Sequence, residues 1–124
     1  MADPDRPARK RRWRDYRTAA GGRPVKEFIS ALSDADAASV VAAMKDIQVN
    51  GTRAARHLRG EIYEVRADGD RVTYRVLFAV EGRSSQVLLA LEAVKKTSQK
   101  AGPDVIALAQ RRLADWRRRA GADG

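Results

Sequence analysis

The sequence contains no cysteine and a single histidine, His57. Without cysteine, disulfide bonds and thiol catalysis are excluded, which fits a reducing compartment. A lone histidine excludes a metal site built from several imidazoles. No apolar run approaches the roughly 20 residues that a membrane-spanning helix needs, and no apolar segment follows the charged N-terminus as it would in a signal peptide. We therefore expect a cytoplasmic protein without a membrane partner.

Positive charge is what the chain has in excess. Its 124 residues carry a formal net charge of +9, and the sequence pI is about 10.6. The length suits one domain with one core, and the charge indicates a polyanionic partner, meaning nucleic acid, an anionic membrane or an acidic protein. We expect a flexible basic arm over residues 1–12, a single domain over 13–119 and a flexible tail over 120–124. The arm either contacts a partner or is only a solvated tail.

The first half of the chain predicts one short strand and two helices. Loose alternation of aromatic and polar residues over 13–18 suggests the strand. Pro24 is well placed to begin a helix, and Ser33 resembles the cap of a second helix that Asn50 and Gly51 would end. We expect the two helices to be antiparallel and to fill residues 24–49.

The second half predicts three strands and a helix. Residues 61–66 and 71–80 alternate between apolar and polar, with the D-G-D turn at 68–70 between them, and residues 86–94 are almost continuously apolar. Gly102, Pro103 and Asp104 then open a last helix. The fold class is therefore α+β, a mainly antiparallel sheet with helices covering one face.

Alternation along the strands also predicts a cationic groove. Apolar residues at 72, 74, 76, 78 and 80 share one face of their strand, so Arg71 and Arg75 project from the opposite, open face. On the preceding strand, Arg66 points the same way. Arginine matches phosphate oxygens with a rigid fork and stays charged at neutral pH. The alternative is an ordinary solvated face.

Three lysines and the histidine are further candidates. Lys95 and Lys96 lie where the last strand leaves the sheet, and Lys100 follows in the same segment. A lysine near other cations has a lowered proton affinity and can exchange protons, although the segment also reads as a surface turn. Residue parity does not choose between Lys95 and Lys96. His57, in a basic loop, is either a general base or a solvent-exposed side chain.

Several segments, taken in order, resemble the HigB-like, phage-derived branch of the RelE/ParE toxin superfamily. They are L-R-G-E-I-Y-E-V-R, Y-R-V-L-F, V-K-K-T-S-Q-K-A-G-P and A-L-A-Q-R-R-L-A-D-W. The resemblance spans residues 13–118 and implies a RelE-like fold with two N-terminal helices on one sheet face and a C-terminal helix. It also implies the toxin of a type II toxin–antitoxin pair, an endonuclease that cuts mRNA on the ribosome.

The resemblance implies a metal-independent reaction with no cofactor, in which the 2′-hydroxyl of the RNA attacks the adjacent phosphate. Arg66 and Arg75 would clamp that phosphate, and Lys95 or Lys96 would stabilise charge or transfer a proton. The resemblance further implies a supporting contact by Lys100. Arg71, from the alternation, and His57, as the one imidazole, are further candidates for substrate contact. Members of the family often carry a histidine or tyrosine near the end of the chain, where this sequence has Trp116 and arginines. Proton transfer would then fall to Lys95, Lys96 or His57.

Two other functions fit the same residues. One is a ParE-like toxin that inhibits DNA gyrase through protein contacts, which has no need of a cationic cleft of phosphate size. The other is a non-enzymatic nucleic-acid-binding or phage accessory protein that uses the basic arm and the last helix. Under the toxin interpretation the partners are mRNA, the ribosome and a cognate antitoxin, which we expect to be a small helix-turn-helix protein.

Overall fold

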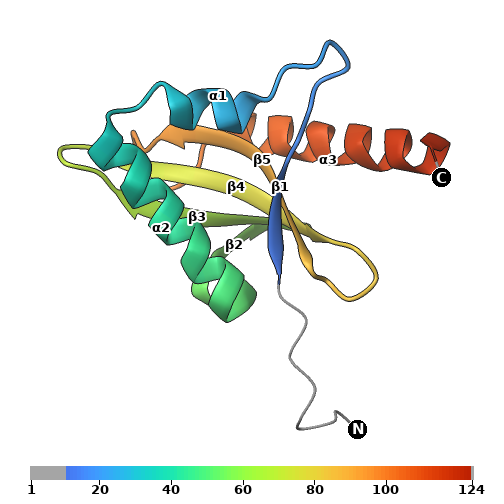
Figure 1. Ribbon diagram of the computed structural model, residues 1–124, viewed down its shortest axis with the longest axis horizontal. Coiled ribbons are helices and arrows are strands. Elements are labelled where there is room, and N and C mark those ends of the chain that lie inside the picture. Colours follow the sequence, from blue (N-terminus) through green and yellow to red (C-terminus); the bar gives the residue numbers. More distant parts are fainter. Residues whose placement is uncertain (1–10, 124) are drawn as a thin grey trace, which may run out of the picture.

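A computed structural model describes residues 11–123 of the chain. A five-stranded sheet of order β1-β5-β4-β3-β2 is flanked by helices α1 and α2 on one side and by α3 on the other (Figure 1). Most of the predicted basic arm, residues 1–10, lies outside the described residues, as does the last residue of the predicted tail. Arg12 already belongs to β1 (Arg12–Asp15), and α3 continues through the predicted tail to Asp123.

The two N-terminal helices begin and end close to the predicted positions. Helix α1 (Pro24–Ser30) begins at its proline, and α2 (Asp34–Asn50) begins after Ser33, whose hydroxyl accepts a hydrogen bond from the backbone N–H of Asp36. Gly51 ends α2 with a φ of 76°, a conformation that glycine adopts at little cost. The short 3-10 helix η1 (Gly51–Ala54) then leads into the sheet.

Four strands form an antiparallel meander in place of the predicted three. They are β2 (Arg56–Arg59), β3 (Ile62–Asp68), β4 (Thr73–Glu81) and β5 (Val87–Lys95). No sequence pattern indicated β2, because its four residues are three polar side chains and one leucine, without apolar alternation. The segment expected to be a basic loop around His57 is therefore a strand at the edge of the sheet.

Strand β1 occupies the other edge and pairs in parallel with β5. The predicted position of β5 inside the sheet is thereby confirmed, since β5 has a neighbour on each side. The indole N–H of Trp13 donates to the backbone carbonyl of Met44 in α2 at 2.7 Å, and the Trp13 ring packs edge-on against Phe78, with 5.1 Å between the ring centroids. These contacts fix β1 against the body of the domain.

Each face of the sheet carries its own apolar core. On the α1–α2 face, Tyr74, Val76 and Phe78 are buried as the alternation predicts. The prediction that the opposite face is open is wrong, because α3 (Pro103–Asp123) packs across it through Ile106, Ala109 and Leu113. The amphipathic last helix has to bury its apolar side, and the buried side chains that face it are Ile62, Leu77, Ala79, Leu89 and Leu91.

Polar contacts tie α3 to the sheet. The Tyr16 hydroxyl donates to Asp115 at 2.6 Å, and Arg112 donates to the backbone carbonyl of Leu91 at 2.7 Å. Near the C-terminal end of the helix, Arg117 bridges Glu61 and Glu81. No helix among the described residues is both long enough and apolar enough to cross a bilayer. The α+β class with its C-terminal helix is as predicted.

Candidate functional site

The two arginines predicted to clamp a phosphate stand directly opposite each other, Arg66 on β3 and Arg75 on β4. Like charges in this arrangement repel one another unless a counter-charge lies between them. Glu64 supplies it. Its Oε2 accepts a hydrogen bond from Arg75 Nη1 at 2.5 Å, and its Oε1 accepts one from Arg66 Nε at 2.9 Å. We call these three side chains the clasp.

Arg75 is buried, whereas the sequence predicted an exposed side chain. Only 2% of it is exposed, compared with 29% of Arg66 and none of Glu64. The face on which they lie is covered by α3 and by the loop before it, and a buried guanidinium persists only when it is paired and hydrogen-bonded. A phosphate in solvent therefore meets Arg66 rather than Arg75. Alternation already placed Glu64 on this face, but the sequence did not show that α3 and the loop before it would cover the face.

The clasp holds the lysine-rich segment between β5 and α3. Arg75 Nη2 donates to the backbone carbonyl of Ser98, and Arg66 Nη2 donates to that of Gln99 at 2.7 Å. The Ser98 hydroxyl in turn donates to the carbonyl of Lys100 at 2.6 Å. Each arginine thus donates one hydrogen bond to this loop, and the clasp fixes the segment in which the predicted lysines lie.

Strand pairing separates Lys95 from Lys96. Lys95 is opposite Tyr74, whose side chain faces α1 and α2. The N–H of Lys96 donates to the carbonyl of Thr73 at 2.7 Å, which extends the ladder by one residue. Because neighbouring residues of a strand alternate between faces, Lys96 is on the same side of the sheet as the clasp and Lys95 is on the other.

The remaining predicted contacts are dispersed. The Arg71 side chain is 91% exposed in the turn between β3 and β4, with its Nε 4.0 Å from the carboxylate of Asp70. Lys100 is exposed in the loop that the clasp holds. His57 pairs with Tyr63 across the β2–β3 ladder, which places it on the α1–α2 face, and its Nε2 is 2.7 Å from the carbonyl of Gly60. The structure does not bring His57 beside Arg66.

A cationic hollow opens beside Arg66 instead. It has a volume of about 310 Å³ and lies between α2, η1, the first residues of β2 and β3. Its charged lining residues are Arg53, Arg56, Arg66, Asp46 and Glu64. Among the described residues, Nη1 of Arg66 has no acceptor, so it remains available to an external one. We call this feature the arginine hollow. Arg53 and Arg56 were not predicted as site residues, although the basic segment around His57 contains both.

The chemistry of the hollow is that of anion binding. Guanidinium groups donate to phosphate oxygens in a fixed planar geometry and cannot lose their charge at neutral pH. Within residues 11–123, no three side chains of the His, Cys, Asp and Glu types converge to hold a metal ion. The hollow can therefore hold a phosphate by charge and hydrogen bonding.

The clearest perturbations of pKa lie outside this site. The Tyr74 hydroxyl, and after it the N–H of Asp70, donate to Asp36 and hold its pKa below the ordinary carboxyl range. The same hydrogen bond to Asp36 raises the pKa of Tyr74. The hydroxyl of Tyr16 likewise lowers the pKa of Asp115. These pairs join separate elements, and their role is to hold the fold together.

Comparison with known proteins finds a family match over most of the chain. A family model described as phage derived protein Gp49-like matches residues 27–114. The matched segment begins within α1 and ends within α3, so it contains the clasp, the arginine hollow and all three predicted lysines. Strand β1 and the last part of α3 lie outside it. No curated protein matches the chain.

Proposed function

We propose that this chain is the toxin of a type II toxin–antitoxin system. The chain belongs to the Gp49-like family of phage-derived, toxin-like proteins, and the proposal starts from that membership. More specifically, it is an endonuclease of the HigB-like kind that cuts mRNA on the ribosome. The family accounts for the toxin-like part of the resemblance seen in the sequence. The endonuclease activity, the ribosome and the HigB-like branch belong to the proposal.

The observation that carries the proposal is the arginine hollow. Three guanidinium groups, from Arg53, Arg56 and Arg66, line a space of about 310 Å³. Two carboxylates, Asp46 and Glu64, also line it, and Glu64 is already paired with the arginines of the clasp. The phosphate backbone of RNA is the polyanion that such a site fits. Arg75 contributes as a positioning residue, because it holds the loop through Ser98 and shares Glu64 with Arg66.

The reaction needs charge stabilisation and two proton transfers. The 2′-oxygen forms a bond to phosphorus as its proton leaves, the bond from phosphorus to the 5′-oxygen breaks, and that oxygen takes up a proton. The products are a 2′,3′-cyclic phosphate and a 5′-hydroxyl. Arg66 would bind the phosphate as its negative charge grows, and Lys96, on the same side of the sheet, would take part in proton transfer. A well-placed donor of this kind contributes about 10²–10³-fold to the rate.

The test is RNA cleavage by the purified chain, with and without ribosomes, followed by mapping of the product ends. We expect new ends that carry a cyclic phosphate, and a loss of about 10²-fold in Arg66→Ala. The matched control is Arg83→Ala, which removes an exposed arginine from the turn after β4 and should leave cleavage unchanged. If the wild type makes no new ends under either condition, the endonuclease proposal is wrong.

A second candidate is nucleic-acid binding without cleavage. It is favoured by the placement of His57 on the α1–α2 face, where it cannot act as an acid or base at the hollow. It is also favoured by the burial of Arg75, which cannot then clamp a phosphate. This candidate predicts that RNA binds at the hollow and that Arg66→Ala weakens binding while no product forms. Binding and cleavage measured on the same samples separate the two candidates.

The proposal includes a cognate antitoxin, expected to be a small helix-turn-helix protein. Its contact with this chain should be acidic, given the net charge of +9. Expression of the chain alone should arrest bacterial growth, and co-expression with a neighbouring helix-turn-helix protein should restore it. Growth arrest that no such neighbour relieves would contradict the antitoxin part of the proposal and leave the nuclease part standing.

A further inference from the structure

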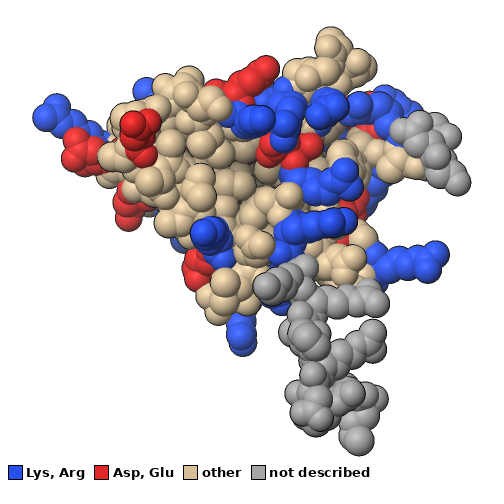
Figure 2. Space-filling view, in the orientation of Figure 1, with Lys and Arg blue, Asp and Glu red and all other residues tan. Residues whose placement is uncertain are grey.

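A second cleft lies away from the arginine hollow, between β1, the loop that follows it and the C-terminal half of α3. Its volume is about 570 Å³. Figure 2 shows lysine and arginine side chains gathered over this region, whereas much of the α1–α2 surface is uncharged. We infer that this cleft is a binding site for a single strand of RNA. The residues that carry the argument are Trp13, Arg14, Arg17, Arg23, Trp116 and Arg119.

Most of the positive charge in the cleft is uncompensated. Four arginines and one carboxylate, Asp15, line it, and Asp15 is paired with Arg23 at 2.6 Å. Within residues 11–123, neither Arg14 nor Arg17 has a carboxylate partner, and both are exposed. Arg119 does pair with a carboxylate on α3, yet its Nε is buried and has no acceptor among the described residues. At Arg14 and Arg17 the cleft therefore presents donors that an incoming anion can satisfy.

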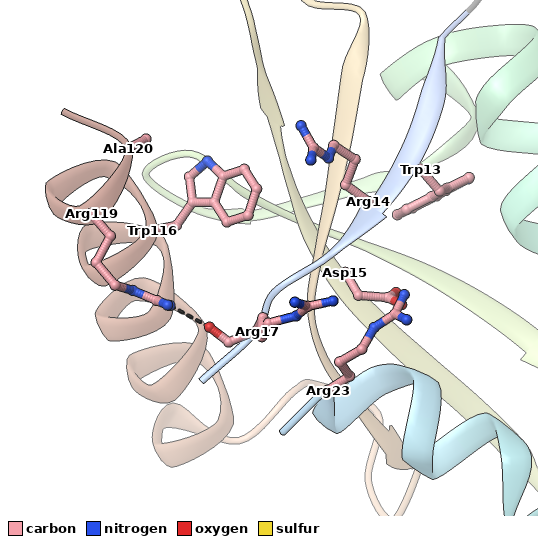
Figure 3. A pocket seen from close by; sticks show the side chains of 8 residues that line it. All are labelled: Trp13, Arg14, Asp15, Arg17, Arg23, Trp116, Arg119 and Ala120. Atoms are coloured by element: carbon pink, nitrogen blue, oxygen red, sulfur yellow. Dashed lines mark hydrogen bonds and ion pairs between the residues drawn. The ribbon is translucent and has the colours of Figure 1, made fainter. Parts of the chain in front are cut away.

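An aromatic ring lies among these cations. The Arg14 guanidinium sits 5.6 Å from the centroid of the Trp116 ring, and Figure 3 shows the two side chains pointing toward each other across the cleft. Trp116 is half-buried, so part of its ring is accessible. Sites for single-stranded nucleic acid combine a cationic groove for the backbone with aromatic rings on which bases stack, and both components are present here.

The chemistry favours RNA over an acidic peptide. A peptide rich in Asp and Glu would satisfy the arginines, but it offers no flat base for Trp116 to stack on. An RNA strand supplies phosphates for Arg14 and Arg17 and bases for the Trp116 ring, so it engages both the cations and the aromatic ring. The choice of RNA over DNA rests on the proposed function. The assignment of the cleft as a nucleic-acid site rests on its residues alone.

The cleft is a feature of this chain rather than of the matched family segment. Every residue that lines it lies before residue 27 or after residue 114, outside the family match. It is also distant from the clasp. The clasp holds the loop just before Pro103, and Trp116 lies 13 residues farther along α3, which at about 1.5 Å per residue is about 20 Å. Two sites so far apart would hold one RNA strand at two points.

The experiment exploits the position of the two tryptophans in the protein, both of which line the cleft. The full-length chain is titrated with a fluorescently labelled RNA of about 12 nucleotides, long enough for a groove of this type, while anisotropy and tryptophan fluorescence are recorded. All 2′-hydroxyls of the RNA are methylated, so that attack on the phosphate is impossible and only binding is measured. We expect tryptophan fluorescence to be quenched in step with the rise in anisotropy.

A pair of charge-matched variants locates the contact. Arg14→Ala/Arg17→Ala removes the two unpaired arginines of the cleft, and Arg83→Ala/Arg111→Ala removes two exposed arginines elsewhere. We expect the first variant to bind about tenfold more weakly, and the slope of log K against log salt to fall in magnitude by about 1.4, or about 0.7 for each lost phosphate contact. The second variant should bind as the wild type does, apart from a small general effect of charge.

Three outcomes would overturn the inference. They are unchanged tryptophan fluorescence on binding, equal loss of affinity in both variants, and an oligoglutamate of equal charge that competes with the RNA one for one. The measurement is independent of cleavage. If the methylated RNA binds in the cleft but unmodified RNA is never cut, the inference stands and the endonuclease proposal fails. Cleavage that persists in Arg14→Ala/Arg17→Ala with unaltered binding gives the reverse result.

Discussion

The clasp and the cleft both contain arginines, but these arginines differ in burial and in hydrogen-bond partners. In the clasp, Arg75 is 2% exposed, bonded to Glu64 and directed at a backbone carbonyl. In the cleft, Arg14 and Arg17 are exposed and have no carboxylate partner among the described residues. Arg66 is intermediate, because it belongs to the clasp and also borders the arginine hollow.

Residue type alone therefore does not identify an anion-binding arginine. A buried guanidinium already donates its hydrogen bonds within the fold, whereas an exposed one without a partner can donate them to a ligand. What decides between the two is a neighbouring carboxylate and the element that covers the face. The contrast can be tested in the same protein by measuring how single substitutions change its free energy of unfolding.

The largest effect should come from Glu64→Leu. Removal of the carboxylate leaves Arg75 buried and uncompensated, which typically lowers the free energy of unfolding by about 3–5 kcal/mol. Urea denaturation measures the change. The control is Glu61→Leu, which breaks an exposed bridge to Arg117 and should cost less than about 1 kcal/mol. In Glu64→Leu/Arg75→Met, part of the loss should be recovered, because the buried charge is also gone. Equal losses in the two single variants would contradict the contrast.

A smaller, pH-dependent effect is expected at Asp36, a buried carboxylate whose partners are the Tyr74 hydroxyl and the N–H of Asp70. The pKa of Asp36 is lowered from 3.8 in the folded state. The stability that it contributes is therefore present above the unfolded value and is lost as the pH falls through the folded pKa. Unfolding by urea from pH 7 down to pH 2.5 should show this loss in the wild type. In Asp36→Asn the acid-side slope should be shallower, and an unchanged slope would rule out this assignment.

Next in size is Arg66→Ala. The Arg66 side chain is 29% exposed, so solvent weakens its pairing with Glu64, and we expect a loss of about 1 kcal/mol in the free energy of unfolding. Because the bond to the Gln99 carbonyl is also lost, hydrogen exchange should quicken at the backbone amides of residues 97–100. Exchange that stays as slow as in the wild type would mean that Arg75 alone holds the loop.

The smallest effect should be that of Arg17→Ala in the cleft. An exposed side chain without a partner contributes little to the fold, and the free energy of unfolding should change by less than about 0.5 kcal/mol. The same urea experiment measures it. A loss as large as that of Arg66→Ala would show that the cleft arginines are structural, and the contrast with the clasp would then disappear.

Local sequence signals predicted much of the fold. The hydroxyl of Ser33 and the left-handed Gly51 set the ends of α2, and alternation placed Tyr74, Val76 and Phe78 on the α1–α2 face. Strand β2 was missed, because a four-residue edge strand with one leucine carries no periodic signal. Alternation tells which residues share a face but not whether another element covers it, so the sequence predicted the last helix but not its packing across the far face of the sheet.

The candidate site was predictable only in part. Alternation correctly placed Glu64, Arg66 and Arg75 on one side of the sheet, yet the sequence did not show that the carboxylate would bind both arginines. The choice between Lys95 and Lys96 depended on the register with β4. The cleft could not be predicted at all, since Arg14 and Trp116 come together only through the parallel pairing of β1 and the packing of α3.

That parallel pairing also bears on the order in which the protein is made. Arg12 pairs with Val87, and Tyr16 donates to Asp115, 99 residues later in the chain. A chain emerging from the ribosome presents β1 first, but its sheet neighbour appears only after α1, α2 and most of the meander have been synthesised, and contacts so distant in sequence form slowly. The cleft can thus be assembled only when synthesis is nearly complete. A nascent chain therefore has no finished cleft until α3 has emerged.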